Sequence, residues 1–208
     1  MKAFTLYLAL AKICLMTIIA ASISACSGGA PLQHQQYDFG PLMTTSAAAT
    51  VPSDALRLSL ADINVPAALD SNAMLYRLQY DNAQQLKPYA QARWSMPPAQ
   101  LLAQRLKLQI GQRGGLLVSS TDGVANLPVL HLDLNEFSQV FTAPDKSYAL
   151  INVTAIVLHR HQLVAQRQFA FHVNATSADA AGGAKAMQEA VDQMIAELQH
   201  WLIQRHPE

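Results

Sequence analysis

Alternating apolar and polar positions predict strands in the second half of the chain. In residues 129–137, three leucines alternate with polar neighbours, the pattern of a strand with one buried face. Residues 147–159 are apolar on both faces and rich in β-branched side chains, as expected for a central strand covered on both sides. Residues 163–173 alternate again, and the short link around His161 predicts an antiparallel hairpin.

The first half of the chain gives shorter and weaker strand patterns. Residues 37–39 are strand-like, and residues 56–65 and 74–80 alternate with period two. Residues 116–118 predict another short strand before a turn. The polar and aromatic segment 84–94 shows no such period, so the pattern predicts a largely irregular conformation there.

Two segments have helical spacing of their apolar residues. The first starts at Pro97-Pro98, since proline is tolerated in a first helical turn, and extends to Ile110 before a group of glycines. The second covers residues 177–205, and its apolar stripe includes Trp201, which is therefore predicted to belong to the core. Two adjacent glycines suggest fraying over residues 178–186.

The order of these elements predicts the fold class. Two strands, a helix, three longer strands and a final helix are typical of an α+β domain. We expect a mostly antiparallel sheet with two helices packed on one face. The domain boundaries follow from the same pattern: a signal peptide at 1–25, a flexible leader at 26–36, and a single α+β domain at 37–206.

The N-terminal segment ends at a cysteine that resembles a bacterial lipobox. Lys2 supplies a positive start, residues 13–23 are apolar but too few to span a bilayer, and Ser24 and Ala25 are small. The pattern predicts cleavage before Cys26 and acylation of its thiol with chains such as palmitate. An ordinary secretory signal with an incidental cysteine is the alternative interpretation.

Composition narrows the function classes. The chain has 208 residues, with 14 basic and 14 acidic side chains. Removing residues 1–25 removes two lysines, so no basic excess remains to bind DNA or RNA. The only cysteines are Cys14 and Cys26, which leaves no pair for a disulfide after processing. The hydrophobic fraction of 51% fits a domain that depends on an apolar core.

Catalytic and metal-binding patterns are missing from the sequence. There is no nucleophile elbow, no phosphate-binding glycine loop and no zinc-binding helix motif. His159 and His161 share a strand face, but the pattern favours an exposed hairpin tip over a metal site. We therefore predict no enzyme activity, no cofactor and no metal. A hydrolase using Asp62, Asp133, His159 and His161 is the competing hypothesis.

An aromatic and basic segment is the candidate contact surface for a partner protein. Arg93 and Trp94 precede the two prolines of the first helix, and Tyr89 lies shortly before them. Tyrosine, tryptophan and arginine are enriched where protein interfaces have most of their binding energy. The favoured interpretation is nevertheless structural, with Trp94 packed under the first helix and Arg93 stacking or capping, and a partner contact is the alternative.

Several of these segments together resemble the ABC-type transport auxiliary lipoproteins, also called the PqiC family. The resemblance covers nearly the whole chain after Cys26, and its most specific part extends from Met74 to Leu102. The matching residues are Cys26, Tyr37-Asp38-Phe39, Val65-Pro66, Leu69-Asp70, Met74-Leu75-Tyr76-Arg77, Leu86-Lys87-Pro88-Tyr89, Arg93-Trp94-Ser95-Met96-Pro97-Pro98, Leu101-Leu102 and Trp201.

The resemblance implies a non-enzymatic role in lipid transport across the envelope. Family members work with a periplasmic MCE-domain protein and inner-membrane permease components, and a homo-oligomer such as a ring fits that role. Ser27 follows the cysteine, and without an aspartate there we expect the periplasmic face of the outer membrane. An outer-membrane assembly or structural lipoprotein that holds a β-barrel or envelope partner is the alternative function.

Overall fold

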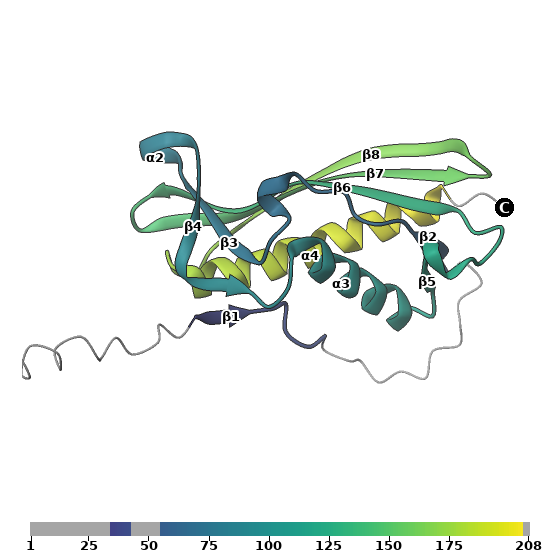
Figure 1. Ribbon diagram of the computed structural model, residues 1–208, viewed down its shortest axis with the longest axis horizontal. Coiled ribbons are helices and arrows are strands. Elements are labelled where there is room, and N and C mark those ends of the chain that lie inside the picture. The colour runs from purple at the N-terminus through teal and green to yellow at the C-terminus, as the bar shows by residue number, and fades with distance from the viewer. Residues whose placement is uncertain (1–33, 43–54, 206–208) are drawn as a thin grey trace, which may run out of the picture. The chain divides into compact units, whose positions relative to one another are not determined.

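The three longest strands of the sheet are β6 (Val129–Ala143), β7 (Lys146–His159) and β8 (Gln162–Asn174). They pair antiparallel in succession (Figure 1), and the short link around His161 predicted the hairpin of β7 and β8. Arg160 and His161 link β7 to β8 with φ angles of 51° and 65°, the left-handed conformation that a two-residue hairpin turn requires. This computed structural model describes residues 34–42 and 55–205.

The other edge of β6 is shared by two strands. β2 (Arg57–Leu60) pairs in parallel with the start of β6, and β3 (Ala73–Leu78) pairs in parallel with its end. Between them, the backbone of Asn64 continues the ladder, with hydrogen bonds to Leu132 and Leu134 of 2.9 Å and 2.8 Å. The predicted strand at 56–65 is therefore a short strand followed by an isolated bridge.

The remaining strands extend the sheet at its two ends. β4 (Ala83–Trp94) pairs antiparallel with β3, and β1 (Gln35–Tyr37) pairs in parallel with the end of β4. β5 (Leu116–Ser119) pairs in parallel with β2. The short helical turns are η2 (Ala67–Leu69), α2 (Gln79–Asn82) and η3 (Ser120–Asp122).

The predicted mostly antiparallel sheet is wrong. The eight-stranded sheet is mixed, and four of its seven strand pairings are parallel. Period-two spacing identifies a strand and its buried face but not the direction of its neighbour. Here the chain from β2 to β3 runs in the same direction as β6, which lies more than 50 residues later.

The segment predicted to be irregular is a strand. β4 has 12 residues, of which only Ala92 and Trp94 are buried. Because most of the strand is exposed on both faces, its sequence has no alternation of apolar and polar residues to reveal it.

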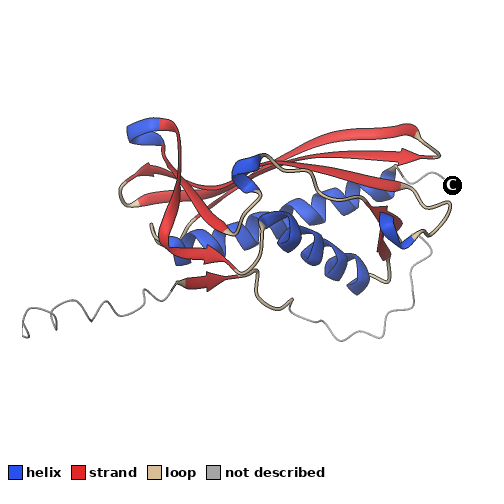
Figure 2. Ribbon diagram, in the orientation of Figure 1, coloured by secondary structure: helices blue, strands red, loops and turns tan. Residues whose placement is uncertain are grey.

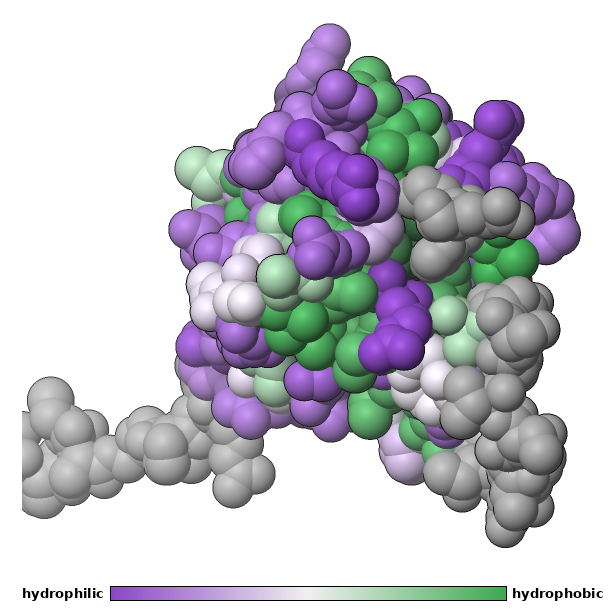
Figure 3. All heavy atoms as spheres, turned by 90° about the vertical axis from the view of Figure 1, so that its right-hand side faces the viewer, coloured by the Kyte–Doolittle hydropathy of each residue, from purple (hydrophilic) through white to green (hydrophobic). Residues whose placement is uncertain are grey.

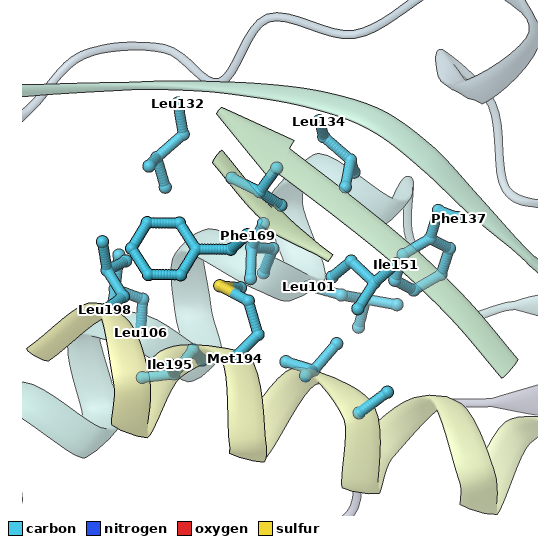
Figure 4. Packing of buried hydrophobic residues seen from close by; sticks show 14 of the residues in the cluster. Leu101, Leu106, Leu132, Leu134, Phe137, Ile151, Phe169, Met194, Ile195 and Leu198 are labelled. Atoms are coloured by element: carbon cyan, nitrogen blue, oxygen red, sulfur yellow. The ribbon is translucent and has the colours of Figure 1, made fainter. Parts of the chain in front are cut away.

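Two long helices lie on the same side of the sheet (Figure 2). α3 (Pro98–Gln112) begins at the two prolines as predicted, and α4 (Ala180–Gln204) covers β7 and β8. The core lies between α4 and the facing side chains of the long strands, where Phe169, Ile151, Met194 and Leu198 meet (Figure 4). Trp201 is 4% exposed and packs edge-on against Phe169, which confirms its predicted place in the core.

The expected fraying at the start of α4 is wrong. Asp179 caps the helix by accepting a hydrogen bond of 2.7 Å from the amide of Gly182, and this contact lowers the pKa of Asp179. Gly182 and Gly183 are buried instead of loose. A Cβ atom on Gly183 would overlap the side-chain amide of Gln139 in β6, so the glycine permits close contact between helix and sheet.

Several predicted features lie outside the described residues. They include the signal peptide at 1–25, Cys26 and most of the leader at 26–36. Gln35 and Gln36, assigned to the leader from the sequence, belong to β1.

Replacing Gly183 with alanine tests this close contact. We expect Gly183→Ala to lower the free energy of unfolding by about 1–3 kcal/mol, because the new methyl group displaces Gln139. Gly111→Ala is the matched control: it is an exposed helical glycine whose Cβ meets no atom within 4 Å, so it should stabilise by about 0.5–1 kcal/mol. Urea unfolding measures both. Equal effects of the two substitutions would contradict the interpretation.

Candidate partner-docking site

An open groove runs along α3. Its volume is about 630 Å³, within the range of pockets that bind small ligands or side chains of a partner. One wall is the chain that follows β2, the second is the exposed face of α3, and the third is β5. The residues that line it are Leu60, Ala61, Asp62, Ile63, Val65, Asp70, Pro97, Ala99, Gln100, Ala103, Gln104, Lys107, Leu117, Val118 and Ser119.

The groove exists because α3 has small side chains on this face. Ala99 and Ala103 are one helical turn apart and therefore share a face, which leaves space above the apolar side chains of Ile63 and Leu117. Lys107 lines the same space. None of the ion pairs in the described part of the chain involves Lys107. The arrangement suits an apolar group with a polar or charged end.

Tyr89 connects the exposed strand β4 to the core. Its hydroxyl donates a hydrogen bond of 2.9 Å to Oε1 of Gln139, whose Nε2 donates to Ser147 Oγ and to the carbonyl of Asp179. Burial, with a smaller contribution from nearby Tyr76, raises the pKa of Tyr89 well above its usual range. Gln139 thus links β4, β7 and the start of α4. Because Tyr89 is half-buried, only part of its side chain is accessible to a partner.

The structure places Trp94 in the core, as the structural interpretation of this segment predicted. The side chain is 2% exposed and packs edge-on against Phe39 and Phe137, with ring centroids 5.9 Å and 5.4 Å away. Burial of the apolar indole ring stabilises the fold, so Trp94 serves the core and is not available to a partner. Arg93 is half-buried, and its Nη2 lies 2.7 Å from Nε2 of His34. Of the three predicted contact residues, Tyr89 and Arg93 reach the surface.

Arg105 is a buried charged residue of α3 that the sequence analysis did not single out. It is 4% exposed and donates two hydrogen bonds, of 2.7 Å and 2.6 Å, to the carboxylate of Asp192 in α4. Its third contact is to the carbonyl of Gly40, at 3.0 Å. The signal was present: Arg105 lies four residues after Leu101 and therefore on the buried stripe of α3, where a charge needs a partner.

The acids and histidines of the competing hydrolase hypothesis do not form one cluster in the described residues. Asp62 lines the groove, and Asp133 in β6 accepts a hydrogen bond of 3.2 Å from Asn64. His159 and His161 are at the β7–β8 turn. Within residues 34–42 and 55–205, no group of three or more His, Cys, Asp or Glu side chains is placed to hold a metal ion.

A comparison with protein-family models identifies the family of this chain. The chain matches the model of the ABC-type transport auxiliary lipoprotein component over residues 37–199 and belongs to that family. The identification made from its motifs is therefore confirmed. A comparison with curated proteins gave no significant match. In the described part of the chain, no helix is both long and apolar enough to cross a membrane.

Solved structures support the same fold. A Xanthomonas campestris protein of the DUF330 family has a TM-score of 0.70 and 21% sequence identity, with 82% of this chain and 95% of that chain covered. A second, uncharacterized protein has a TM-score of 0.60 and 15% identity, with 82% and 99% covered. Both similarities concern the fold alone.

The buried Arg105–Asp192 pair predicts that replacing Arg105 destabilises the protein much more than replacing an exposed arginine. We expect Arg105→Met to lower the free energy of unfolding by about 2–4 kcal/mol, because it leaves Asp192 without its main partner. Arg167 forms an ion pair with Glu197 at 2.7 Å, with both side chains about 40% exposed, so Arg167→Met should cost less than about 1 kcal/mol. Chemical denaturation of both variants measures the difference. Similar losses would show that burial of the pair is unimportant.

The buried hydroxyl of Tyr89 predicts that the stability of the protein decreases at alkaline pH. We expect Tyr89→Phe to lower stability by about 1–2 kcal/mol near neutral pH, since Gln139 loses a hydrogen bond. The raised pKa means that the native protein keeps a proton that the unfolded chain loses above about pH 10. The contribution of Tyr89 is therefore present below that pH and decreases as the pH rises.

Denaturation of both proteins between neutral and alkaline pH measures this change. The stability gap between wild type and Tyr89→Phe should narrow above about pH 10. Tyr80→Phe is the control, because Tyr80 is 49% exposed. A stability difference that stays constant with pH would contradict the claim that the native protein holds a proton on Tyr89.

Proposed function

We propose that this chain is a non-enzymatic, periplasm-facing lipoprotein subunit of an MCE/ABC-type envelope lipid transport system. In this role it docks onto or caps the transport conduit at the outer membrane. Family membership over residues 37–199 supports a part in ABC-type transport. The lipobox at Cys26 supports a lipid anchor, and the serine after it supports sorting to the outer membrane. The partners in this proposal are a periplasmic MCE-domain protein and inner-membrane permease components.

The open groove along α3 is the observation that favours a docking role over a purely structural one. Its floor and walls contain apolar side chains such as Ile63 and Leu117, and the charged side chains of Asp62, Asp70 and Lys107 line it as well. An apolar segment of the MCE-domain protein with charged groups of both signs at its ends fits this chemistry, because opposite charges pair across the rim of an interface. Arg93 and Tyr89 remain secondary contact candidates on β4.

Filling the groove tests the proposal. We expect the wild-type lipoprotein to co-purify in mild detergent with the MCE-domain protein of the same cell. Ala103→Trp should weaken this association at least about tenfold, which corresponds to about 1.4 kcal/mol, because the indole occupies the groove. Gln112→Trp is the matched control: it adds the same side chain to an exposed position of α3 that does not line the groove.

Three outcomes separate the possibilities. Absence of the MCE-domain protein from the wild-type preparation contradicts the transport role. Capture of a β-barrel or other envelope protein in its place supports the assembly lipoprotein instead. Equal binding by Ala103→Trp and the control leaves the transport role standing but excludes the groove. Membrane fractionation of Cys26→Ala, which should release the protein from the membrane, checks the anchor in the same strains.

A further inference from the structure

Exposed apolar side chains gather at one end of the domain. The structure exposes seven large apolar residues in its described part, and five of them lie at the end where β8, β7, β6, β2 and β5 stop or start. We name this surface the basic end. Its apolar residues are Leu116, Val124, Leu163, Val164 and Ile203.

Strand register places Leu163 and Leu116 at the same end of the sheet. Leu163 in β8 is opposite Leu158 in β7, and Leu158 is opposite Val129 in β6. Val129 is in turn opposite Ser59 in β2, and the same strand pairs with β5 at Leu116. Four strand spacings of about 4.8 Å separate β8 from β5, so the surface is about 19 Å wide along the sheet.

The hairpin of β7 and β8 projects beyond the helix that covers the rest of the sheet. Trp201 packs against Phe169, and α4 ends three residues later, about 4.5 Å further along its axis. The six strand residues from Phe169 back to Leu163 extend about 20 Å. No turn of α4 therefore covers Leu163, which is 63% exposed (Figure 1).

Four exposed arginines of the described residues lie at the basic end. Arg57, Arg113, Arg160 and Arg205 are exposed there, and none of them takes part in the ion pairs of the described residues. In η3, Asp122 accepts a hydrogen bond from the amide of Ser119.

A direct view of this end shows how its apolar and hydrophilic side chains are distributed. In Figure 3, apolar surface in green occupies the middle of the face and hydrophilic side chains in purple interrupt and surround it. Arginine pairs with phosphate through two parallel hydrogen bonds, and exposed aliphatic side chains bury their area among lipid headgroups. An anionic lipid surface offers both interactions together, over an area as wide as this end of the sheet.

We propose that the basic end binds the surface of a membrane that contains anionic phospholipids. The arginines contact the lipid phosphates, and Leu163 and Val164 at the projecting hairpin enter the headgroup layer. This contact is separate from the acyl anchor and from the groove along α3, because none of its apolar residues lines that groove. It goes beyond the proposed docking function and does not depend on an MCE-domain partner.

Vesicle binding by the chain without its anchor tests this proposal. The protein is the chain from residue 26 onward with Cys26→Ser, which prevents acylation. We expect it to float with vesicles of phosphatidylcholine and phosphatidylglycerol at about 3:1, and at least about tenfold less with phosphatidylcholine alone. Raising the salt from about 0.05 M to about 0.5 M should weaken the binding, since screening acts on exposed charges.

Matched substitutions locate the contact. Arg113→Glu with Arg160→Glu, and separately Leu163→Asp with Val164→Asp, should each reduce flotation at least about tenfold. Lys87→Glu with Lys146→Glu is the control, because it reverses the same amount of charge on β4 and at the β6–β7 turn. Circular dichroism verifies that each variant is folded.

A fluorescent label gives a second measurement that does not depend on removing charges. With Cys26→Ser the chain has no cysteine after the signal, so Leu163→Cys accepts a single polarity-sensitive dye. Its emission should shift to the blue with anionic vesicles, and a dye at Tyr80→Cys should not shift. No flotation with anionic vesicles, equal binding to neutral ones, or an equal loss in the lysine control would overturn the proposal. An acidic protein partner would then be the better occupant.

Discussion

The structure depends on burying one face of β6, β7 and β8 under α4. The sheet offers a continuous apolar face, and the helix matches it with a stripe from Met187 to Leu202 that is almost entirely removed from water. Apolar burial contributes about 25 cal/mol per Å², so this contact dominates the favourable free energy of folding. The contact also sets the spacing at the start of the helix, where Gly183 lies directly against Gln139.

The other elements follow from this contact. β6 is covered on one side by α4 and paired on both edges, so it fixes the positions of β2 and β3 along its length. α3 packs against α4 and β5 and not across the whole sheet. The space left between α3 and the chain after β2 is the groove. Its position is thus a consequence of how few contacts α3 makes with the sheet.

The sequence was informative where burial is one-sided and uninformative where it is not. The long strands and both helices were visible in the spacing of their leucines and β-branched residues. β4 was missed because exposure on both faces removes that spacing, and the parallel pairing of β2 with β6 was missed because spacing has no direction. The same limit applies to the candidate site. Trp94 has the residue type of an interface but lies in the core. The spacing of Arg105 from Leu101 indicates that Arg105 is buried, but it does not identify the partner, Asp192.

The link between Arg105 and the carbonyl of Gly40 has a mechanical consequence. A pull on the chain from its N-terminal side first meets β1, whose three residues lie parallel to the end of β4 and therefore resist as a shear of several hydrogen bonds together. Behind them, Phe39 is held between aromatic rings and Gly40 is held to both helices through Arg105. Tension on the N-terminal segment is thus shared by the sheet and the two helices before it can peel the first strand away.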